Sequence, residues 1–445
     1  MEITPTKLTI SQLFNNRNEQ FSIPAYQRRY AWGDKQVGEL FEDIARLKEN
    51  ETHFFGTILL LTDSHRADLN SLEVVDGQQR IITLSILLKA IQDRINELKE
   101  EEASKDIDSH LYCQGLDRKK QNKIILGDLD EPDYYRVLNL ENIEEIKNKN
   151  LIQAYNTIKN LISKDDFEKL NKFLFKLLHK SIVIRLDTQK ANDAYKLFET
   201  INNRGLRLSP TDIIKNFILG HSSLINENTL KKVRENWKEL IINLDGISTD
   251  AFFRQVLCGS LKQKITYKKL ISEFKKYYIG MVKESEMLPE ARYIDYFEEE
   301  NGDLEESNGD GPIIVKERNK IIKSKKNKRK ISIIEFSNML KETSLIYKKI
   351  NKKSFDNKKI NQHIDNLQRI EAFPTYIFLL NLFKKNIEDS QKIEILKILE
   401  SFMLRRHICE KRTSELDDIF SKLTEGGDEN IVERVKKASR ISSRR

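Results

Sequence analysis

Residues 72–95 read LEVVDGQQRIITLSILLKAIQDRI, and this stretch decides the fold of the first half of the chain. Val74 and Val75 are typical of a strand, which runs straight into the polar segment 76–80. Behind that segment, apolar residues recur at helical spacing. They are Ile81, Leu84, Leu88, Ile91 and Ile95. The stretch therefore predicts a strand followed at once by a helix with one buried face.

The junction between them, Asp76-Gly77-Gln78-Gln79-Arg80, has the residues of an anion-binding turn. A strand that ends at a helix N-terminus leaves several backbone N–H groups unpaired, with a partial positive charge behind them. Gly77 lets a ligand approach the backbone closely, and Arg80 offers a planar fork for phosphate. Asp76 could hold a hydrated magnesium ion or orient water. The structural alternative makes Asp76 an N-cap and Gln79 its capping-box partner.

Upstream, residues 21–33 read FSIPAYQRRYAWG and predict an edge strand or an ordered loop, because Pro24 holds its predecessor extended. In an extended segment Arg28 and Arg29 point to opposite faces, so one can enter a site while the other remains solvated. Asp34 is expected to cap the helix that follows. Residues 53–61 are rich in β-forming side chains, and with the strand before Asp76 they predict a hairpin.

Downstream, residues 96–180 are polar and mostly helical in pattern, and residues 181–186 predict a further strand. The next helix should bury Ala194, Leu197, Phe198 and Ile201 and stop at the sequence Asn202-Asn203-Arg204-Gly205, where Gly205 is a natural left-handed cap.

Ser209 and Pro210 then predict the start of another helix, with Ser209 as its cap. Asp212 and Lys215 lie three positions apart on that helix, on the face opposite its apolar residues. Their spacing predicts a surface ion pair. Alternatively, this polar corner is a second anion-binding helix N-terminus.

Alternating strands and helices predict an α+β protein with two domains. Residues 1–225 form the first domain, with a helical insertion at about 96–180. Residues 226–445 form a mostly α-helical domain that contains a charged loop at about 284–330. The basic block Lys316–Lys330 is either a solvated loop or a phosphate-binding arm.

Composition excludes several classes of protein. The 445 residues carry a net charge of +8, a modest bias that suits a polyanion partner. The three cysteines are far apart, the N-terminus does not resemble a secretory signal, and no apolar run approaches the length of a membrane span. We therefore expect a cytoplasmic protein without a membrane partner. The sequence contains no P-loop, no GxSxG or HExxH motif and no visible His-Asn-His nuclease site.

Four segments in order resemble a known family: IPAYQRRYAW (23–32), HFFGTILL (53–60), VVDGQQR (74–80) and LFETINNRGLRLSPTDIIKN (197–216). Together they resemble the N-terminal domain of GmrSD-type type IV restriction enzymes, which also occurs in SspE-like phage-defence proteins. The resemblance covers about residues 8–220 and extends weakly to SFMLRRHICEKRTSELDDIF at 401–420.

This resemblance implies a ParB/sulfiredoxin-like fold for the first domain. It also implies that the DGQQR motif binds and hydrolyses a nucleoside triphosphate (GTP, ATP or another) with Mg²⁺. Asp76 and Arg80 would then be catalytic, with Asp76 also the metal ligand. The residues that match the family's nucleotide-binding elements are Tyr26, Gln27, Arg28, Gly77, Gln78, Gln79, Asn203, Arg204, Gly205, Asp212 and Lys215.

The resemblance also implies DNA as a partner, in particular modified phage DNA. Fused members of the family carry an HNH-like nuclease domain, and this sequence stops where that domain would begin. We therefore expect either a separate HNH-type nuclease subunit or a shortened form of a longer chain, with little nuclease activity in these residues. A homodimer is a further expectation.

Three functions remain open at this point. The first is a divalent-metal-dependent NTPase whose hydrolysis gates attack on DNA. The second is a nucleotide- and DNA-binding module without turnover. The third is a ParB-like DNA nickase. Asp76 and Arg80 serve the first two equally.

Overall fold

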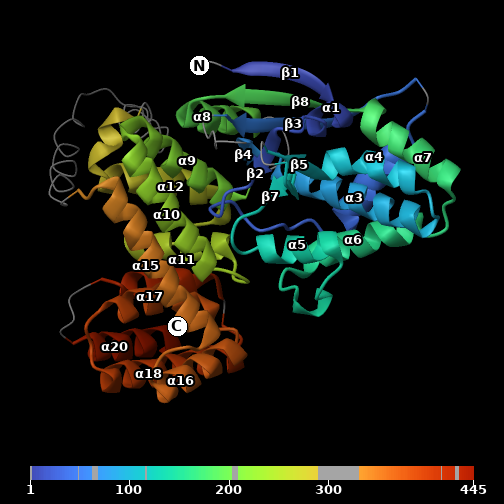
Figure 1. The fold of residues 1–445 in the computed structure, drawn as a ribbon. Coiled ribbons are helices and arrows are strands. Elements are labelled where there is room, and N and C mark those ends of the chain that lie inside the picture. The colour runs from blue at the N-terminus through green and yellow to red at the C-terminus, as the bar shows by residue number, and fades with distance from the viewer. Residues whose placement is uncertain are drawn as a thin grey trace, which may run out of the picture. The chain divides into compact units, whose positions relative to one another are not determined.

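The structure is a computed structural model that describes residues 3–48, 50–62, 69–115, 118–202, 209–288, 330–411, 413–425 and 430–444 (Figure 1). Internal contacts divide the chain into two compact units, residues 1–207 and 208–445. The helix α9 (Pro210–Ile225), which the sequence placed at the end of the first domain, lies in the second unit. The molecule is otherwise of the expected class, an α+β unit followed by a helical one.

The first unit is built on a six-stranded mixed sheet with the strand order β1-β8-β3-β4-β2-β7. The strands are β1 (Thr4–Thr9), β2 (Glu19–Ser22), β3 (His53–Leu61), β4 (Asn70–Asp76), β7 (Ile124–Ile125) and β8 (Ser181–Thr188). The expected β3–β4 hairpin is an antiparallel pair, whereas β2 runs parallel to β4. A separate two-stranded ribbon pairs β5 (Tyr112–Gln114) with β6 (Lys120–Asn122).

Most helices of this unit pack around α3 (Gln78–Glu97), whose apolar residues share one core with the sheet. The expected stripe from Ile81 to Ile95 is buried, but so are Ile82 and Leu87, which lie off it. The stripe alone underestimated the burial because α3 is packed against several helices of the insertion. The unit's remaining helices before the last strand are α1 (Ile10–Phe14), α2 (Asp34–Ala45), α4 (Glu101–Leu111), α5 (Glu131–Asn139), α6 (Lys149–Ile162) and α7 (Phe167–Phe175).

The last helix of the unit, α8 (Ala191–Asn202), contacts β3, β4 and β8 (Figure 1). Ala194 and Phe198 are buried as expected, Leu197 is half-buried, and Tyr195 is buried in addition. The core around α3 takes Leu72 and Val74 of β4. Glu73 alternates with these residues and therefore faces the opposite side of the sheet, where it meets α8.

Residues 21–33 combine the end of β2 with an ordered loop, so both readings of this segment apply in part. The strand is not at the sheet edge, because β7 pairs with its outer side. Asp34 does not cap α2. The N-cap is Gly33, whose N–H donates to Gln36, while the carboxylate of Asp34 accepts hydrogen bonds from Gln153 and Thr157 on α6.

The second unit consists of helices in the part that the structure describes, apart from one isolated bridge between Val282 and Ile331. Aromatic side chains on α10, α11, α12 and α15 form its core, with Trp237 stacked on Phe253. After α9 the helices are α10 (Glu227–Asn243), α11 (Thr249–Leu261), α12 (Leu270–Met281), α15 (Ile333–Lys352), α16 (Lys358–Arg369), α17 (Tyr376–Lys384), α18 (Asp389–Ile408), α19 (Leu416–Leu423) and α20 (Ile431–Arg444).

The expected charged loop lies mostly outside the described residues, which resume at Lys330. No described helix combines the length and the apolar character that a membrane crossing requires.

Candidate ligand-binding site

The strand–helix junction has the geometry of an open helix N-terminus. Asp76 is the last residue of β4, Gly77 is the N-cap with φ of 94°, and α3 begins at Gln78. No side chain caps this helix, so the expectation that Asp76 is its N-cap is wrong. The left-handed backbone at Gly77 takes the chain from strand to helix in one residue. The first-turn N–H groups of α3 are therefore left to water or to a ligand.

Gln79 is a buried link between α3 and the loop that follows β2. Its Oε1 accepts hydrogen bonds from the backbone N–H of Ala31 at 2.8 Å and of Trp32 at 3.3 Å. Its Nε2 donates to the carbonyl oxygen of Arg29 at 3.3 Å. Gln79 therefore stabilises the loop rather than forming a capping box with Asp76, which corrects the structural alternative drawn from the sequence.

Arg80 joins the junction to β3. Its Nη1 donates to the carbonyl oxygen of Phe55 at 2.7 Å, and its Nη2 lies 3.7 Å from Oδ2 of Asp76. Burial lowers the pKa of the guanidinium, and the Asp76 carboxylate partly opposes this. An arginine still keeps its proton at neutral pH. The side chains of Asp76 and Arg80 are 21% and 23% exposed, so both are accessible from solvent while they are held in place.

Tyr26 and Gln27 anchor the loop to the sheet. The Tyr26 hydroxyl donates to the carboxylate of Glu73 and lies 3.4 Å from the hydroxyl of Tyr195 on α8. Nε2 of Gln27 donates to the carbonyl oxygens of Val74 and Val75, directly before Asp76. Segments far apart in the sequence therefore meet at the end of β4.

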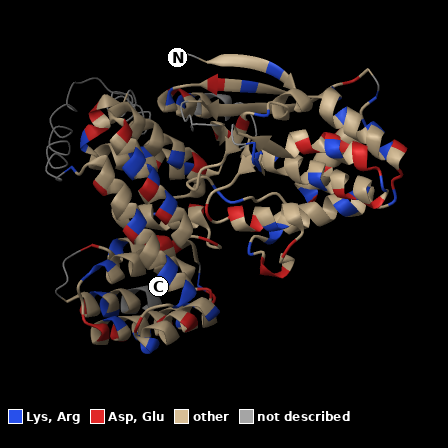
Figure 2. Cartoon of the chain, viewed as in Figure 1, with Lys and Arg blue, Asp and Glu red and all other residues tan. Residues whose placement is uncertain are grey.

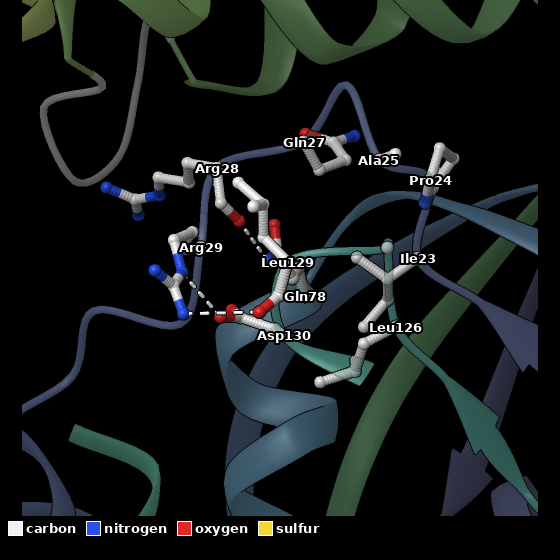
Figure 3. A pocket seen from close by; sticks show the side chains of 11 residues that line it. Ile23, Pro24, Ala25, Gln27, Arg28, Arg29, Gln78, Leu126, Leu129 and Asp130 are labelled. Carbon is white, nitrogen blue, oxygen red and sulfur yellow. Dashed lines mark hydrogen bonds and ion pairs between the residues drawn. The ribbon is translucent and has the colours of Figure 1, made fainter. Parts of the chain in front are cut away.

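Arg28 and Arg29 have the opposite environments that an extended segment predicts. Arg29 is held by carboxylates, with its Nε 2.6 Å from Asp130 and its Nη2 3.3 Å from Asp133 (Figure 3). Arg28 is exposed, and its side chain points away from this cluster in Figure 3. The carbonyl oxygen of Arg28 accepts a hydrogen bond from Nε2 of Gln78 at 2.5 Å. The exposed guanidinium thus lies on a loop that is tied to the first turn of α3.

The sequence reading missed the contribution of the insertion. Asp130 accepts from the backbone N–H of Tyr30 at 2.7 Å as well as from Arg29, and Asp133 accepts from the N–H groups of Lys147 and Asn148. The acidic run around Pro132 is a helix-start signal, because Pro at the first turn and nearby carboxylates favour a helix N-terminus. Nothing in that signal shows that the same carboxylates bind an arginine roughly a hundred positions away.

The third cluster divides into two parts. Asn203, Arg204 and Gly205 lie outside the described residues, and Asp212 and Lys215 belong to the second unit. Ser209 caps α9 as expected. The expected surface ion pair is instead buried, with the Lys215 and Asp212 side chains 3% and 10% exposed and 3.9 Å between Nζ and Oδ1. The spacing was correct, but α9 is buried on nearly all sides rather than on one.

The first unit is thus an α+β domain in which an open helix N-terminus, an arginine-bearing loop and helix α8 converge. Residues 10–219 match the family model described as GmrSD restriction endonuclease, N-terminal domain. This part of the chain belongs to that family, which confirms the resemblance seen in its four segments. The family indicates a component of a phage-defence restriction system that interacts with DNA. No curated protein matches the chain.

Proposed function

We propose that the first unit binds a nucleoside triphosphate with Mg²⁺ at the Asp76–Arg80 junction and hydrolyses it as part of a restriction system that senses modified DNA. The observation that carries this proposal is the uncapped start of α3 behind Gly77. Its backbone N–H groups and the partial positive charge of the helix favour phosphate. The exposed Arg28, held nearby by Gln78, adds a charge-assisted donor.

Magnesium fits this donor set when it arrives with the nucleotide. Among the described residues, no group of three or more His, Cys, Asp or Glu side chains could hold a metal by itself. Mg²⁺ in phosphate sites is commonly held by one or two carboxylates together with the phosphates. Asp76 would supply one carboxylate, and Mg²⁺ would neutralise charge on the phosphates. Arg80 would orient that carboxylate, because its Nη2 lies beside Oδ2.

We further propose that DNA contacts lie mainly on the second unit, because the positive charge is there. Residues 1–207 hold 31 Lys and Arg against 33 Asp and Glu, a net charge of −2. The remaining residues hold 46 against 36, a net charge of +10. Figure 2 shows these basic positions spread along many helices and interleaved with acidic ones. Such a distribution favours phosphate contacts, which carry no sequence information themselves.

Calorimetry with ATP and with GTP, in the presence of Mg²⁺, tests nucleotide binding. We expect Asp76→Ala to weaken binding by at least about tenfold and to remove its dependence on Mg²⁺, since charge-assisted contacts contribute roughly 1.5–3 kcal/mol each. Arg46→Ala, on the exposed surface of α2, is the control and should bind normally. Wild-type protein that binds neither nucleotide, or Asp76→Ala protein that binds like wild type, would contradict the proposal.

Release of inorganic phosphate, measured with and without DNA, then separates an NTPase from a binding module without turnover. We expect release that depends on Mg²⁺ and is lost in Asp76→Ala. Tight binding without release would favour the non-hydrolysing module.

A further inference from the structure

A pocket lies beside the proposed phosphate site, between the loop after β2, the first turn of α3 and the turn at residues 126–130 (Figure 3). It encloses about 280 Å³ of empty space and is open to solvent on one side. This is just below the range of roughly 300–1,000 Å³ that is usual for small-molecule sites. The pocket therefore has room for one ring system and not for a whole nucleotide.

The walls of the pocket are mostly apolar. Ile23, Leu126 and Leu129 line it, and Figure 3 shows their side chains around the opening. Gln78 supplies a polar edge. Nε2 of Gln78 is bonded to the carbonyl oxygen of Arg28, and no described residue donates a hydrogen bond to its Oε1. Apolar walls with one placed acceptor suit a planar group whose rim carries an N–H donor.

Contacts within the first unit hold the pocket in shape. Arg29 donates to the carbonyl oxygen of Leu129 at 3.2 Å, and Asp130 binds both Arg29 and the backbone of Tyr30. The turn also lies directly against the loop, since a Cβ atom at Gly127 would be 2.5 Å from Cα of Ala25. A site whose walls are already ordered loses less entropy when a ligand binds.

We propose that this pocket holds the nucleobase of the nucleotide whose phosphates bind at the start of α3. The inference rests on the proposed function, and it assigns the insertion a role in recognising the ligand. Gln78 connects the two parts, because its backbone N–H belongs to the first turn of α3 and its side chain lines the pocket. The base would lie against the apolar side chains and donate an N–H to Oε1 of Gln78.

Comparison of nucleotides with inorganic tripolyphosphate tests the inference, because tripolyphosphate carries the phosphates without a base. We expect calorimetry with Mg²⁺ to show ATP or GTP binding at least about tenfold more tightly than tripolyphosphate. Leu129→Trp, which fills the pocket, should reduce the nucleotide affinity to that of tripolyphosphate and leave tripolyphosphate binding unchanged. Leu161→Trp is the control, because Leu161 is 44% exposed on α6 of the same unit.

Each outcome has a separate meaning. Equal affinity for nucleotide and tripolyphosphate in the wild type overturns the nucleobase site and leaves the phosphate site standing. Failure of wild type to bind either compound overturns the proposed function and, with it, this inference. If Leu129→Trp does not fold, Gln78→Ala replaces it. That variant should weaken nucleotide binding about fivefold through the lost acceptor, with tripolyphosphate unaffected. An unchanged nucleotide affinity in Gln78→Ala would then overturn the nucleobase site.

Discussion

Gly77 shows how one residue determines the junction between β4 and α3. Its φ of 94° lies in a region that residues with a Cβ atom adopt only with strain. A Cβ atom there would also lie 3.1 Å from Cγ1 of Ile58 on β3. Both effects act against any other residue at this position before a ligand is considered. Gly77 is therefore required by the fold as well as by the proposed approach of phosphate.

We predict that Gly77→Ala lowers the free energy of unfolding by about 1–3 kcal/mol, the usual cost of a strained backbone position. The matched control is Gly38→Ala within α2, where an added Cβ would have no neighbour within 4 Å. In a helix this change should instead stabilise the protein by about 0.5–1 kcal/mol. Urea unfolding followed by circular dichroism measures both. Equal midpoints for Gly77→Ala and wild type would show that the junction tolerates a Cβ atom.

Arg80 has two connected roles. Its hydrogen bond to Phe55 stabilises the bulged part of β3, while its neighbour Asp76 is the proposed metal ligand. Replacing Arg80 would therefore change stability and binding together. Asp76 is the cleaner residue for testing the ligand, since Arg80 contributes its only ion pair among the described residues.

At the scale of elements, the loop after β2 depends on two other elements for its conformation. Gln79 on α3 bonds its backbone, and the turn before α5 binds Arg29 and Tyr30. Loops held in this way can position ligand-binding side chains with little loss of entropy. The adjacent arginines therefore make a natural pair of variants, one for stability and one for binding.

We predict that Arg29→Met lowers the free energy of unfolding by about 2–3 kcal/mol, because it leaves two buried carboxylates with fewer partners. This is less than for a fully buried pair, since the Arg29 side chain is 20% exposed. Arg28→Met should change stability by less than about 0.5 kcal/mol and weaken tripolyphosphate binding several-fold. Urea unfolding and calorimetry on both variants test this division. The reverse pattern would assign the site to Arg29.

At the scale of the whole molecule, the two units differ in charge more than in size. The net charge of +8 is the sum of a slightly acidic first unit and a strongly basic second one. A polyanion is therefore attracted to the second unit, while the proposed nucleotide site lies on the first. Communication between the sites would require binding energy at one to favour one state of the other.

We predict that affinity for DNA falls steeply with salt, with a slope of about −0.9 for each phosphate contacted. Replacing Lys323, Lys325, Lys326, Lys328 and Lys330 by Gln should flatten that slope if the basic block is a phosphate-binding arm. The control replaces five exposed lysines of the first unit: Lys35, Lys48, Lys164, Lys169 and Lys172. Fluorescence anisotropy over a range of salt concentrations measures both variants. An unchanged slope in the first variant would identify the block as a solvated loop.

The sequence by itself determined the local elements and the order in which they occur. The strand before Asp76, the helix behind it, the Ser209 cap and the buried face of α8 all follow from side-chain periodicity and cap chemistry, which act between near neighbours. The resemblance of four segments to one family was also readable in this way and is confirmed over residues 10–219.

Only the tertiary structure decided which polar side chains are committed to the fold. Gln79 bonds a backbone 48 positions away, and Arg29 meets its carboxylates 101 and 104 positions away. The pocket likewise needs the turn at residues 126–130 to lie against the loop after β2. Such partners depend on long-range packing, so periodicity cannot show them. Asp212 and Lys215 illustrate the same limit: their spacing identified the ion pair, but its burial depends on how α9 is packed.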